Sequence, residues 1–482
     1  MRFSRYSIMM LTPQNLIRLT EDSIVNEKLK FTEKLGFGLG EVAGCMNSLI
    51  AAFLTMFYTD SMLMAAGAVG TMFFVSKLFD GITDLIAGTM VDNTRTKWGK
   101  ARPWLLWGSI PTGLALALIF LMPEHFSATG KMIYAFITYN FFTSVMYTIV
   151  GVAKAALMPR MTYDGQQRGQ LAIFSLIFGL GGTILLMSLT FPLMFRFGGG
   201  VTGWRIAFGI YGAITTLALI FSFLLTREKV GENVSQDSTK QSGVKFTDGL
   251  KLFFTNKYFL IAAAITILVN FQTNINSSGQ VYFYTYNMNN PMLTSSLSMV
   301  GLIPTVISIV FLSGPSLRFL GKKKSIYVGA GVMIVGYAIR AAAGAIANVP
   351  MLIVGTVICS LATGPISVPV NVLSADAVDY GDYTQKTRIE GIGSSVVSFA
   401  QKISSGLAAG AVGWILQLTG YVANQTQTAT ASFGITLIFA YAPMIALVLA
   451  ILILFIFYRY DKIEPEVRSY LEHKNSKEAN PA

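Results

Sequence analysis

Charged side chains are scarce in this chain. Asp, Glu, Lys and Arg make up 12% of its 482 residues, whereas a soluble globular protein has roughly a quarter. Hydrophobic residues make up 53%, and apolar stretches of about twenty residues, enough to cross a bilayer, recur along the chain. Strand-period alternation is absent, so these stretches are predicted to be helices, which satisfy their own backbone hydrogen bonds in lipid.

Cysteine and histidine are also rare, and each occurs twice. Cys45 and Cys359 lie in apolar stretches, so no disulfide framework is indicated. His125 and His473 fall outside these stretches, which excludes a buried histidine proton relay. The sequence contains no cluster of metal ligands, no phosphate-binding loop and no soluble region large enough for a nucleotide site, so we do not expect an enzyme.

The apolar stretches predict an all-α polytopic membrane protein with twelve transmembrane helices in two pseudo-symmetric halves of six. The spans are expected at residues 39–59, 66–91, 103–122, 131–157, 172–196, 204–226, 258–286, 294–317, 325–347, 350–373, 392–417 and 431–458. The polar stretch at 227–257 separates the halves and has the composition of a linker. The expected parts are a tail at 1–35, a bundle at 36–226, the linker, a bundle at 258–458 and a tail at 459–482.

The 36 Lys and Arg residues are distributed unevenly over the predicted loops. The two tails and every second loop hold 29 of them, whereas the alternate loops hold none. Positive charge is retained on the cytoplasmic side, so both termini are predicted to be cytoplasmic, in a multi-pass protein of the inner (cytoplasmic) membrane. The same rule accounts for the formal net charge of +12 without a nucleic-acid partner.

Two short matches relate the halves of the chain. Phe57-Tyr58-Thr59 recurs as Phe283-Tyr284-Thr285 at an offset of 226 residues, and Gly88 recurs as Gly314 at the same offset. Each glycine precedes a basic loop, and the matches fall in corresponding helices. Two six-helix halves with basic loops after their second helices are typical of the major facilitator architecture, whose substrate site lies between the halves.

Three charged residues lie inside the second predicted span, in the stretch SKLFDGITDLIAG at 76–88. At about 100° per residue, Lys77, Asp80 and Asp84 share one face of this helix. Two carboxylates so close need a cation beside them, which H⁺ or Na⁺ would supply. Thr83 adds a hydroxyl. The alternative is a Lys77–Asp80 salt bridge that only joins helices, but it leaves Asp84 unexplained.

Two further spans carry polar stripes. In the fourth span, one face holds Asn140, Ser144, Tyr147, Gly151 and Lys154, with Thr148 adjoining. In the seventh span, the i, i+3, i+4, i+7 positions of one helix face hold Asn270, Thr273, Asn274 and Ser277. Amides, hydroxyls and an ammonium suit a small solute with many hydroxyl groups. Hydrogen bonds between helices are the alternative for both stripes.

A family resemblance extends this interpretation. KLFDGITDLIAGTMVDNTRTKWGKARPW at 77–104 resembles the second helix and following loop of the glycoside–pentoside–hexuronide:cation symporters, a major facilitator family typified by melibiose permease. EKLGFGLGEVAG and FYTD in the first helix, MPRMTYDGQQRGQL after the fourth and SADAVDYGDYTQKTRIEGIGSSV before the eleventh are similar too. The resemblance covers helices 1–5 and 10–11 clearly and implies alternating-access transport of a sugar together with H⁺ or Na⁺.

The resemblance assigns roles to the charged helix face. Asp80 and Asp84 match the acidic pair that binds the coupling cation, and Lys77 matches the basic residue beside it. Thr148 matches a threonine that contributes to the cation site. Thr83 stands where melibiose permease has an asparagine important for Na⁺, which leaves H⁺ open as the coupling ion.

The sugar contacts of the family carry over only in part. Lys402 and Tyr147 match family residues, of which the lysine lines the sugar cavity, but the family's galactoside contacts fall on small or apolar residues. Glu41, about one turn from the missing first-helix aspartate, is a candidate replacement. Lys154 suits a carboxylate, as in a hexuronide. In a neutral glycoside site it would instead pair with Glu41 or Asp84.

The predicted function is cation-coupled symport of a sugar, with the bilayer, the sugar and the cation as partners, no cofactor and a functional monomer. The expected substrate contacts are Glu41, Asn140, Ser144, Tyr147, Lys154, Asn270, Asn274 and Lys402. A cytoplasmic gate is expected at Asp92, Arg95, Asp379 and Arg388, with solvated loop charge as the alternative. The alternative functions are a major facilitator carrier of a lipid or drug, which the polar stripes disfavour, and a non-transporting membrane sensor.

Overall fold

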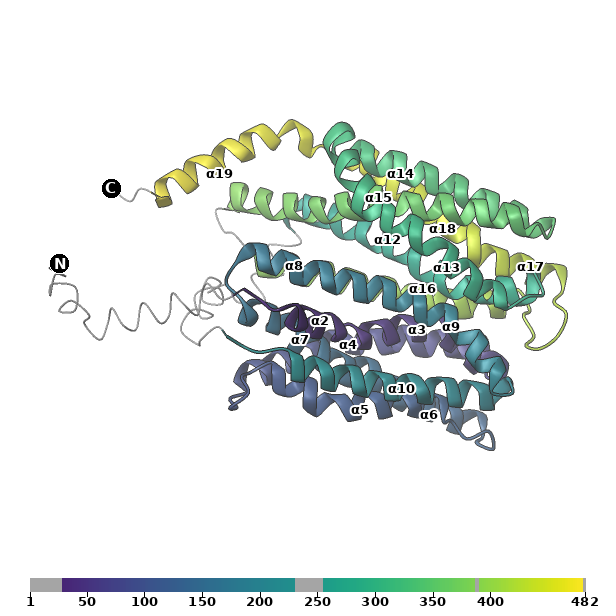
Figure 1. The fold of residues 1–482 in the computed structure, drawn as a ribbon. Helices are drawn as coiled ribbons and strands as arrows, with labels where there is room; N and C mark the ends of the chain where they lie inside the picture. The colour runs from purple at the N-terminus through teal and green to yellow at the C-terminus, as the bar shows by residue number, and fades with distance from the viewer. Residues whose placement is uncertain (1–27, 230–254, 386–389, 480–482) are drawn as a thin grey trace, which may run out of the picture.

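The computed structural model of the protein describes residues 28–229, 255–385 and 390–479. Apart from one isolated bridge between Thr96 and Gly99, all regular structure in these ranges is helical. The helices lie side by side along a common direction, with the amino-terminal helices in one layer and the carboxy-terminal helices in the other (Figure 1). The predicted all-α class is confirmed.

The amino-terminal helices include three π-helical turns, labelled η, that continue a preceding α-helix. The elements are α2 (Phe31–Leu39), α3 (Val42–Met56), η1 (Phe57–Ser61), α4 (Ala66–Asn93), α5 (Arg102–Phe120), α6 (Ala128–Asn140), η2 (Phe141–Tyr147), α7 (Thr148–Met161), α8 (Gly165–Leu176), η3 (Ile177–Gly181), α9 (Gly182–Arg196) and α10 (Gly200–Leu225). Because α2 begins at Phe31, helical structure starts five residues before the expected first bundle.

The carboxy-terminal helices follow the same plan. The elements are α12 (Lys257–Tyr282), η4 (Phe283–Asn287), α13 (Met292–Ile307), η5 (Ser308–Leu312), α14 (Ser313–Ala345), α15 (Val349–Gln385), α16 (Glu390–Leu418), α17 (Ala429–Thr436), η6 (Leu437–Tyr441), α18 (Ala442–Phe457), the short 3₁₀ turn η7 (Tyr460–Lys462) and α19 (Glu464–Ala479). Within α14, Gly321 has φ 72° and ψ 170°, a left-handed conformation that breaks the helical path and that glycine tolerates.

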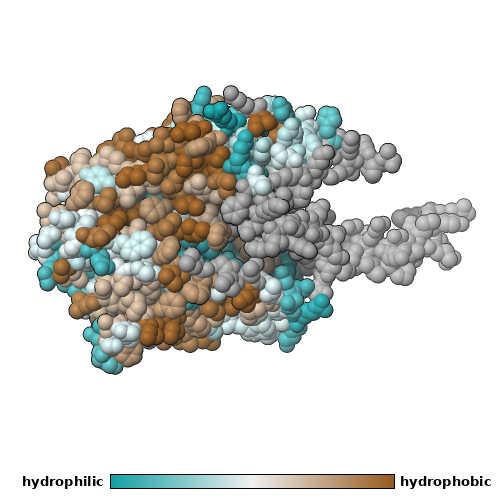
Figure 2. Space-filling model, turned by 180° about the vertical axis from the view of Figure 1, so that it is seen from behind, coloured by the Kyte–Doolittle hydropathy of each residue, from teal (hydrophilic) through white to brown (hydrophobic). Residues whose placement is uncertain are grey.

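Nine helical runs in the described ranges are long and apolar enough to cross a bilayer. One of them, Met292–Ala345, includes the break at Gly321. The 28-residue α4 is not among the nine, since its charged residues lower its hydropathy. Exposed apolar side chains form a broad brown area over one face of the molecule (Figure 2), as expected for a surface that contacts lipid. The number of twelve spans stays a prediction.

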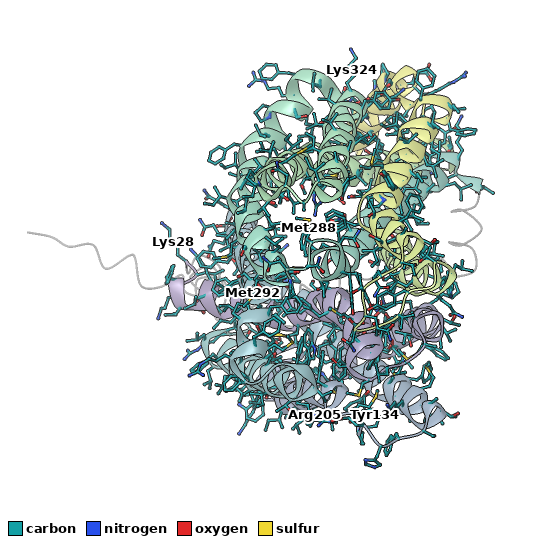
Figure 3. The ribbon with its side chains drawn as sticks, turned by 90° about the vertical axis from the view of Figure 1, so that its right-hand side faces the viewer. Lys28, Tyr134, Arg205, Met288, Met292 and Lys324 are labelled. Atoms are coloured by element: carbon teal, nitrogen blue, oxygen red, sulfur yellow. The ribbon has the colours of Figure 1, made fainter. Side chains whose placement is uncertain are left out.

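The main helix pairs that join the two layers are α4 with α16, α3 with α12, and α9 with α13. We call the end of the bundle that holds residues 62–65, 288–291 and 419–428 the distal end. Figure 3 looks onto this end and shows the carboxy-terminal helices above and the amino-terminal helices below, with Met288 near the middle. The helix α19 lies at the opposite end (Figure 1).

The two copies of the Phe-Tyr-Thr repeat have the same local structure. Both lie in π turns, η1 and η4, at the distal ends of α3 and α12. The Met62 amide donates to the Phe57 carbonyl at 3.0 Å, and the Met288 amide donates to the Phe283 carbonyl at 3.1 Å. The next residue has a positive φ in both copies, 54° and 50°. The offset seen in the sequence therefore relates equivalent helix ends.

These equivalent ends meet at Asp60, which the sequence placed in a loop. Its buried carboxylate accepts hydrogen bonds from the Tyr286 and Tyr421 hydroxyls at 2.5 Å each and from Thr59 at 2.6 Å. The Asn424 side chain donates to the Asp60 carbonyl at 2.7 Å. Because Tyr286 lies in η4 and Tyr421 in the loop after α16, this network ties the two layers together at the distal end.

Two expected non-helical segments at the other end are largely helical. The loop expected at 374–391 is occupied as far as Gln385 by α15, and most of the tail expected at 459–482 forms α19. Lys322 explains how these extensions are held, because its ammonium contacts Asp376 of α15 at 2.7 Å and Glu464 of α19 at 2.9 Å. No proline interrupts residues 370–385, so the helix has no reason to stop at the membrane boundary.

Close packing of α4 against α16 can be tested at Gly70. A Cβ added there would lie 2.7 Å from the Gly410 carbonyl oxygen and 3.0 Å from the Gly413 Cα, both backbone atoms. We expect Gly70→Ala to lower the Tm of the purified protein by a few degrees, because overpacking costs about 1–3 kcal/mol. Gly88→Ala on the same helix meets nothing within 4 Å and is the matched control. Equal Tm values for the two variants would contradict this packing.

Candidate functional site

Asp80 lies in the middle of α4 and is 4% exposed. Its Oδ2 accepts a hydrogen bond from the Lys77 ammonium at 2.8 Å, one helical turn earlier. Its Oδ1 accepts from the Ser144 hydroxyl of η2. The helical spacing of Lys77 and Asp80 therefore produces the ion pair that the sequence offered as one alternative, and a hydroxyl from a second helix completes it.

Asp84 lies one turn further along α4 and is held differently. The Lys402 ammonium of α16 forms an ion pair with its Oδ2 and also donates to the Asp80 carbonyl at 3.0 Å. Lys402, which has no acid nearby on its own helix, thus contacts two groups of α4. The two carboxylates and two ammonium groups balance in charge, and Lys402 connects the two layers of the fold.

The hydroxyl groups expected near the cation take up local hydrogen bonds. Thr83 donates to the Asp80 carbonyl at 3.1 Å, and Thr148 donates to the Thr143 carbonyl at 3.2 Å. Each hydroxyl oxygen keeps lone pairs that can accept a proton or face a cation. Asn140 lies beside Asp80, because its side-chain oxygen accepts a hydrogen bond at 3.1 Å from Ser144, which also contacts Asp80.

A third ion pair lies where the start of α3 meets α7 and α8. The Lys154 ammonium contacts the Glu41 carboxylate, and Ser175 donates to the same carboxylate oxygen. The ammonium also lies 4.5 Å from the centre of the Phe37 ring. Lys154 is 8% exposed and has a counter-charge within the protein. This pairing corresponds to the alternative in which the sugar is neutral and Lys154 pairs with Glu41. Tyr147 packs against the apolar cluster that includes Phe37.

A cavity of about 290 Å³ lies between the two layers, and we call it the central cavity. Its lining is rich in hydroxyl and amide groups and comes from α3, α4, α6, α9, α12 and α16. The polar lining residues are Asn47, Ser48, Thr55, Lys77, Tyr139, Thr183, Thr273, Asn274, Ser277, Ser278 and Ser405. Lys77 is therefore both the partner of Asp80 and part of the cavity wall.

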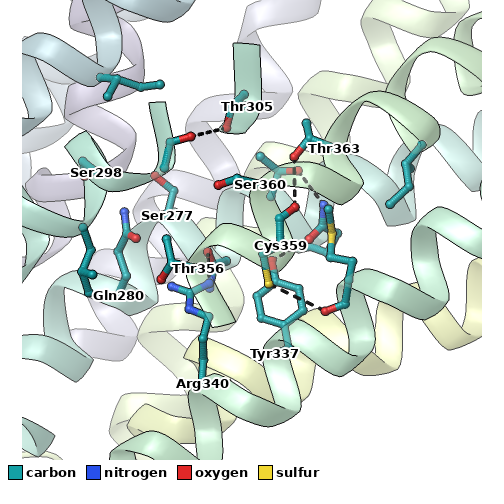
Figure 4. A pocket seen from close by; sticks show the side chains of 18 of the residues that line it. Ser277, Gln280, Ser298, Thr305, Tyr337, Arg340, Thr356, Cys359, Ser360 and Thr363 are labelled. Carbon is teal, nitrogen blue, oxygen red and sulfur yellow. Dashed lines mark hydrogen bonds between the residues drawn. The ribbon is translucent and has the colours of Figure 1, made fainter. Parts of the chain in front are cut away.

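Helix α12 has two polar faces, and sequence reasoning found one of them. Asn274 lines the central cavity as expected, whereas Asn270 donates to the Thr266 carbonyl and lies outside the lining. The second face carries Gln272, Asn276 and Gln280, spaced by four residues, and lines a neighbouring cavity of about 320 Å³ (Figure 4). The i, i+4, i+8 spacing was a signal for this face that the sequence analysis missed.

Three of the four residues expected to form a gate are described by the structure, and Asp92, Arg95 and Asp379 lie at the end opposite the distal end. Asp92 contacts Arg160 at 3.5 Å, and its side chain is 68% exposed. Arg95 is exposed. Asp379 lies on α15 in the extension that was expected to be a loop. Arg388 lies outside the described residues.

Comparison with known proteins identifies the family. The chain matches the family described as MFS/sugar transport protein over residues 36–462. The chain belongs to this family. The family is one of membrane transporters, so the protein is a transporter rather than an enzyme, and its helices cross the membrane several times.

Three curated relatives have similar sequences. The isoprimeverose transporter of Lactiplantibacillus pentosus is 31% identical over 463 residues, which is 95% of this chain and 94% of that protein. A putative glycoside/cation symporter of Escherichia coli (strain K12) is 31% identical over 83% of this chain and 85% of its own length. A glucuronide carrier protein homolog from the same strain is 30% identical over 85% and 89%. The predicted membership of the glycoside–pentoside–hexuronide:cation symporters is confirmed.

A solved structure supports the fold. A partially occluded, inward-open structure of the xylose transporter XylE from Escherichia coli superposes with a TM-score of 0.59 at 14% identity, over 89% of this chain and 99% of that chain. At this identity the likeness concerns the fold alone. The predicted major facilitator fold is confirmed.

The Glu41–Lys154 pair generates a test of charge pairing. We expect Glu41→Gln to lower the Tm of the purified protein by several degrees, because it leaves the Lys154 ammonium buried without a counter-charge. The double variant Glu41→Gln/Lys154→Met removes both charges and should recover most of the loss. A double variant as unstable as the single variant would show that the two charges are not coupled.

Proposed function

We propose that the protein couples the movement of a sugar to that of a cation and that Lys77 links the two sites. The supporting observation is its double position: the ammonium donates to Asp80 at 2.8 Å and also lines the hydroxyl-rich central cavity. A cation that neutralises Asp80 releases this ammonium, which changes the charge and the hydrogen-bond donors that the sugar meets. Coupling of this kind is reciprocal, so the sugar raises the affinity for the cation by the same factor.

Alternating access would use the contacts that join the two layers. Lys402 ties α16 to Asp84 and to the Asp80 carbonyl on α4, and Asp60 with Tyr286 and Tyr421 closes the distal end. A cation at Asp84 displaces Lys402 and loosens the α4–α16 contact. Rearrangement of these two layer contacts lets one end open as the other closes.

The coupling ion is proposed to be H⁺ or Na⁺. Both carboxylates provide oxygen ligands of the kind that hard cations prefer. Thr83, next to Asp84 in sequence, and Thr148 of α7 are the candidate hydroxyl ligands. A proton needs one carboxylate, whereas Na⁺ needs several oxygens together. Either ion would replace a lysine ammonium as the counter-charge of the acidic pair.

The membrane topology is proposed from the charge pattern. Two bundles at 36–226 and 258–458, each with six spans, would be joined by the linker at 227–257. Both termini would be cytoplasmic, in the inner (cytoplasmic) membrane of a bacterium, and the distal end would then face outward. A functional monomer is proposed.

The substrate is proposed to be a glycoside, pentoside or hexuronide. The names of the relatives mention isoprimeverose, glycosides and a glucuronide carrier. The central cavity supports this class, because seven of its lining residues carry aliphatic hydroxyl groups that suit a polyhydroxylated ligand. A carrier of a lipid or drug would need a more apolar cavity. A sensor that does not transport would not need the proposed cation-coupling site.

The acidic pair provides the decisive variants. We expect Asp80→Asn and Asp84→Asn each to abolish accumulation of the sugar above its external concentration, because an amide neither takes up a proton nor supplies a charge for Na⁺. Asp461→Asn, at an exposed carboxylate 3.6 Å from Lys323, should accumulate sugar like the wild type. The measurement is uptake of labelled sugar in energised vesicles, with folding checked by Tm. Normal accumulation by either site variant would contradict the proposed coupling.

The ion can be identified in de-energised vesicles. External pH and Na⁺ activity are recorded together while glycosides, pentosides and hexuronides are added one at a time. Alkalinisation with one sugar identifies that sugar and H⁺, whereas a fall in external Na⁺ identifies Na⁺. Absence of any response from folded protein would contradict sugar symport and favour a carrier of another solute.

A further inference from the structure

Arg340 of α14 is a buried cation that neither the coupling site nor the Lys154 cluster uses. It is 3% exposed, and one face of its guanidinium lies 4.3 Å from the centre of the Phe439 ring. One terminal nitrogen donates to the Tyr284 hydroxyl at 3.0 Å and the other to the Asn276 side-chain oxygen at 3.4 Å. The buried Nε–H has no partner among the described residues.

The partners of Arg340 differ in kind from those of the lysines inside the helical bundle. Lys77, Lys154 and Lys402 each contact a carboxylate. Both hydrogen-bond acceptors of Arg340 are neutral, and no carboxylate of the described part of the chain forms an ion pair with it. A charge in this position is costly unless it is paired, so an unpaired intramembrane arginine points to a ligand or ion as its partner.

Arg340 faces a cavity of about 320 Å³, which we call the arginine cavity (Figure 4). Its wall has further polar groups from α12, α13 and α15, among them Gln280, Ser298 and Thr356. Thr273 and Ser277 line both the arginine cavity and the central cavity, so the two spaces adjoin along α12. Ile184 and Met187 of α9 complete the wall from the other layer.

We propose that the arginine cavity is the subsite for an anionic group of the transported sugar, a carboxylate as in a hexuronide, and that Arg340 is its counter-charge. This inference rests on the proposed sugar symport. Tyr284, Asn276 and Phe439 hold the guanidinium in one orientation while leaving its charge uncompensated. The remaining N–H donors match the two oxygens of a carboxylate, a geometry that lysine cannot reproduce. The sugar hydroxyls would then extend past Ser277 into the central cavity.

This assignment changes which basic residue recognises a hexuronide. Lys154, the candidate from the sequence, already has Glu41 as its counter-charge. A substrate carboxylate near Lys154 would have to displace Glu41 and would meet its negative charge. Arg340 has no such competitor in the described chain, so it is the better partner for an anion.

The test compares sugars that differ at one position. Matched p-nitrophenyl glucosides and glucuronides, in both anomeric forms, are measured as competitors of uptake and as ligands that raise the Tm of purified protein. We expect Arg340→Gln to weaken the glucuronide about ten- to a hundredfold, the range for a hydrogen bond to a charged group, and to change the glucoside less than about twofold. Arg340→Lys should recover part of the glucuronide affinity.

Arg205→Gln is the matched control, because Arg205 also lies in a membrane helix but contacts Glu124 at 3.2 Å. It should leave the preference between the two sugars unchanged. Equal loss of both sugars in folded Arg340→Gln, or an unchanged glucuronide affinity, would overturn the subsite. If Arg340→Gln fails to fold, the partial loss expected for Arg340→Lys decides the question.

Two results would separate this inference from the proposed function. A wild type that transports only neutral sugars would overturn the anionic subsite and leave sugar symport intact, whereas a wild type that responds to no sugar would remove both. Replacing chloride by methanesulfonate, which carries no carboxylate and no hydroxyl groups, tests an inorganic anion as the partner. A chloride requirement for neutral sugar uptake that disappears in Arg340→Gln would overturn the assignment to the sugar carboxylate.

Discussion

The ion pair between Lys402 and Asp84 is the contact on which the coupling site depends. It holds a carboxylate of α4 with an ammonium of α16, so the pairing of charge is also a contact between the two layers. Both side chains are partly exposed, and each lies on a membrane helix, where a charge usually needs a partner. Any cation that takes the place of Lys402 must therefore change the packing of α4 against α16. Occupancy of the cation site is thereby linked to the conformation of the bundle.

The layer contact at the distal end has no ion pair among the described residues. There the Asp60 carboxylate accepts hydrogen bonds from three hydroxyl groups. Asp60 and Tyr286 stand at equivalent positions of the sequence repeat, 226 residues apart, and bond to each other across the approximate symmetry of the fold. Neutral donors satisfy this carboxylate, so the contact depends on hydrogen bonds to hydroxyl groups rather than on a counter-charge. The bundle thus combines a charge-controlled contact near its middle with a hydrogen-bonded one at its distal end.

The basic residues inside the helical bundle divide into two groups with different uses. Lys77, Lys154 and Lys402 are neutralised by carboxylates of the chain, and the pairs of Lys154 and Lys402 join separate helices. Arg340 is held by neutral groups, so its charge is available to the carboxylate of the proposed substrate. The same physical cost, that of an unpaired charge in the membrane, therefore explains both the internal ion pairs and the inferred anion subsite.

The sequence by itself determined the membrane class, the charged face of α4 and the family, because hydropathy, helical spacing and local motifs depend on neighbouring residues. It also contained the repeat that relates Phe57 to Phe283. Only the tertiary structure decided that Lys402 pairs with Asp84 and Lys154 with Glu41, since these partners lie 318 and 113 residues apart. Their pairing depends on how each helix is rotated and which helices adjoin, and neither property follows from spacing within a single span.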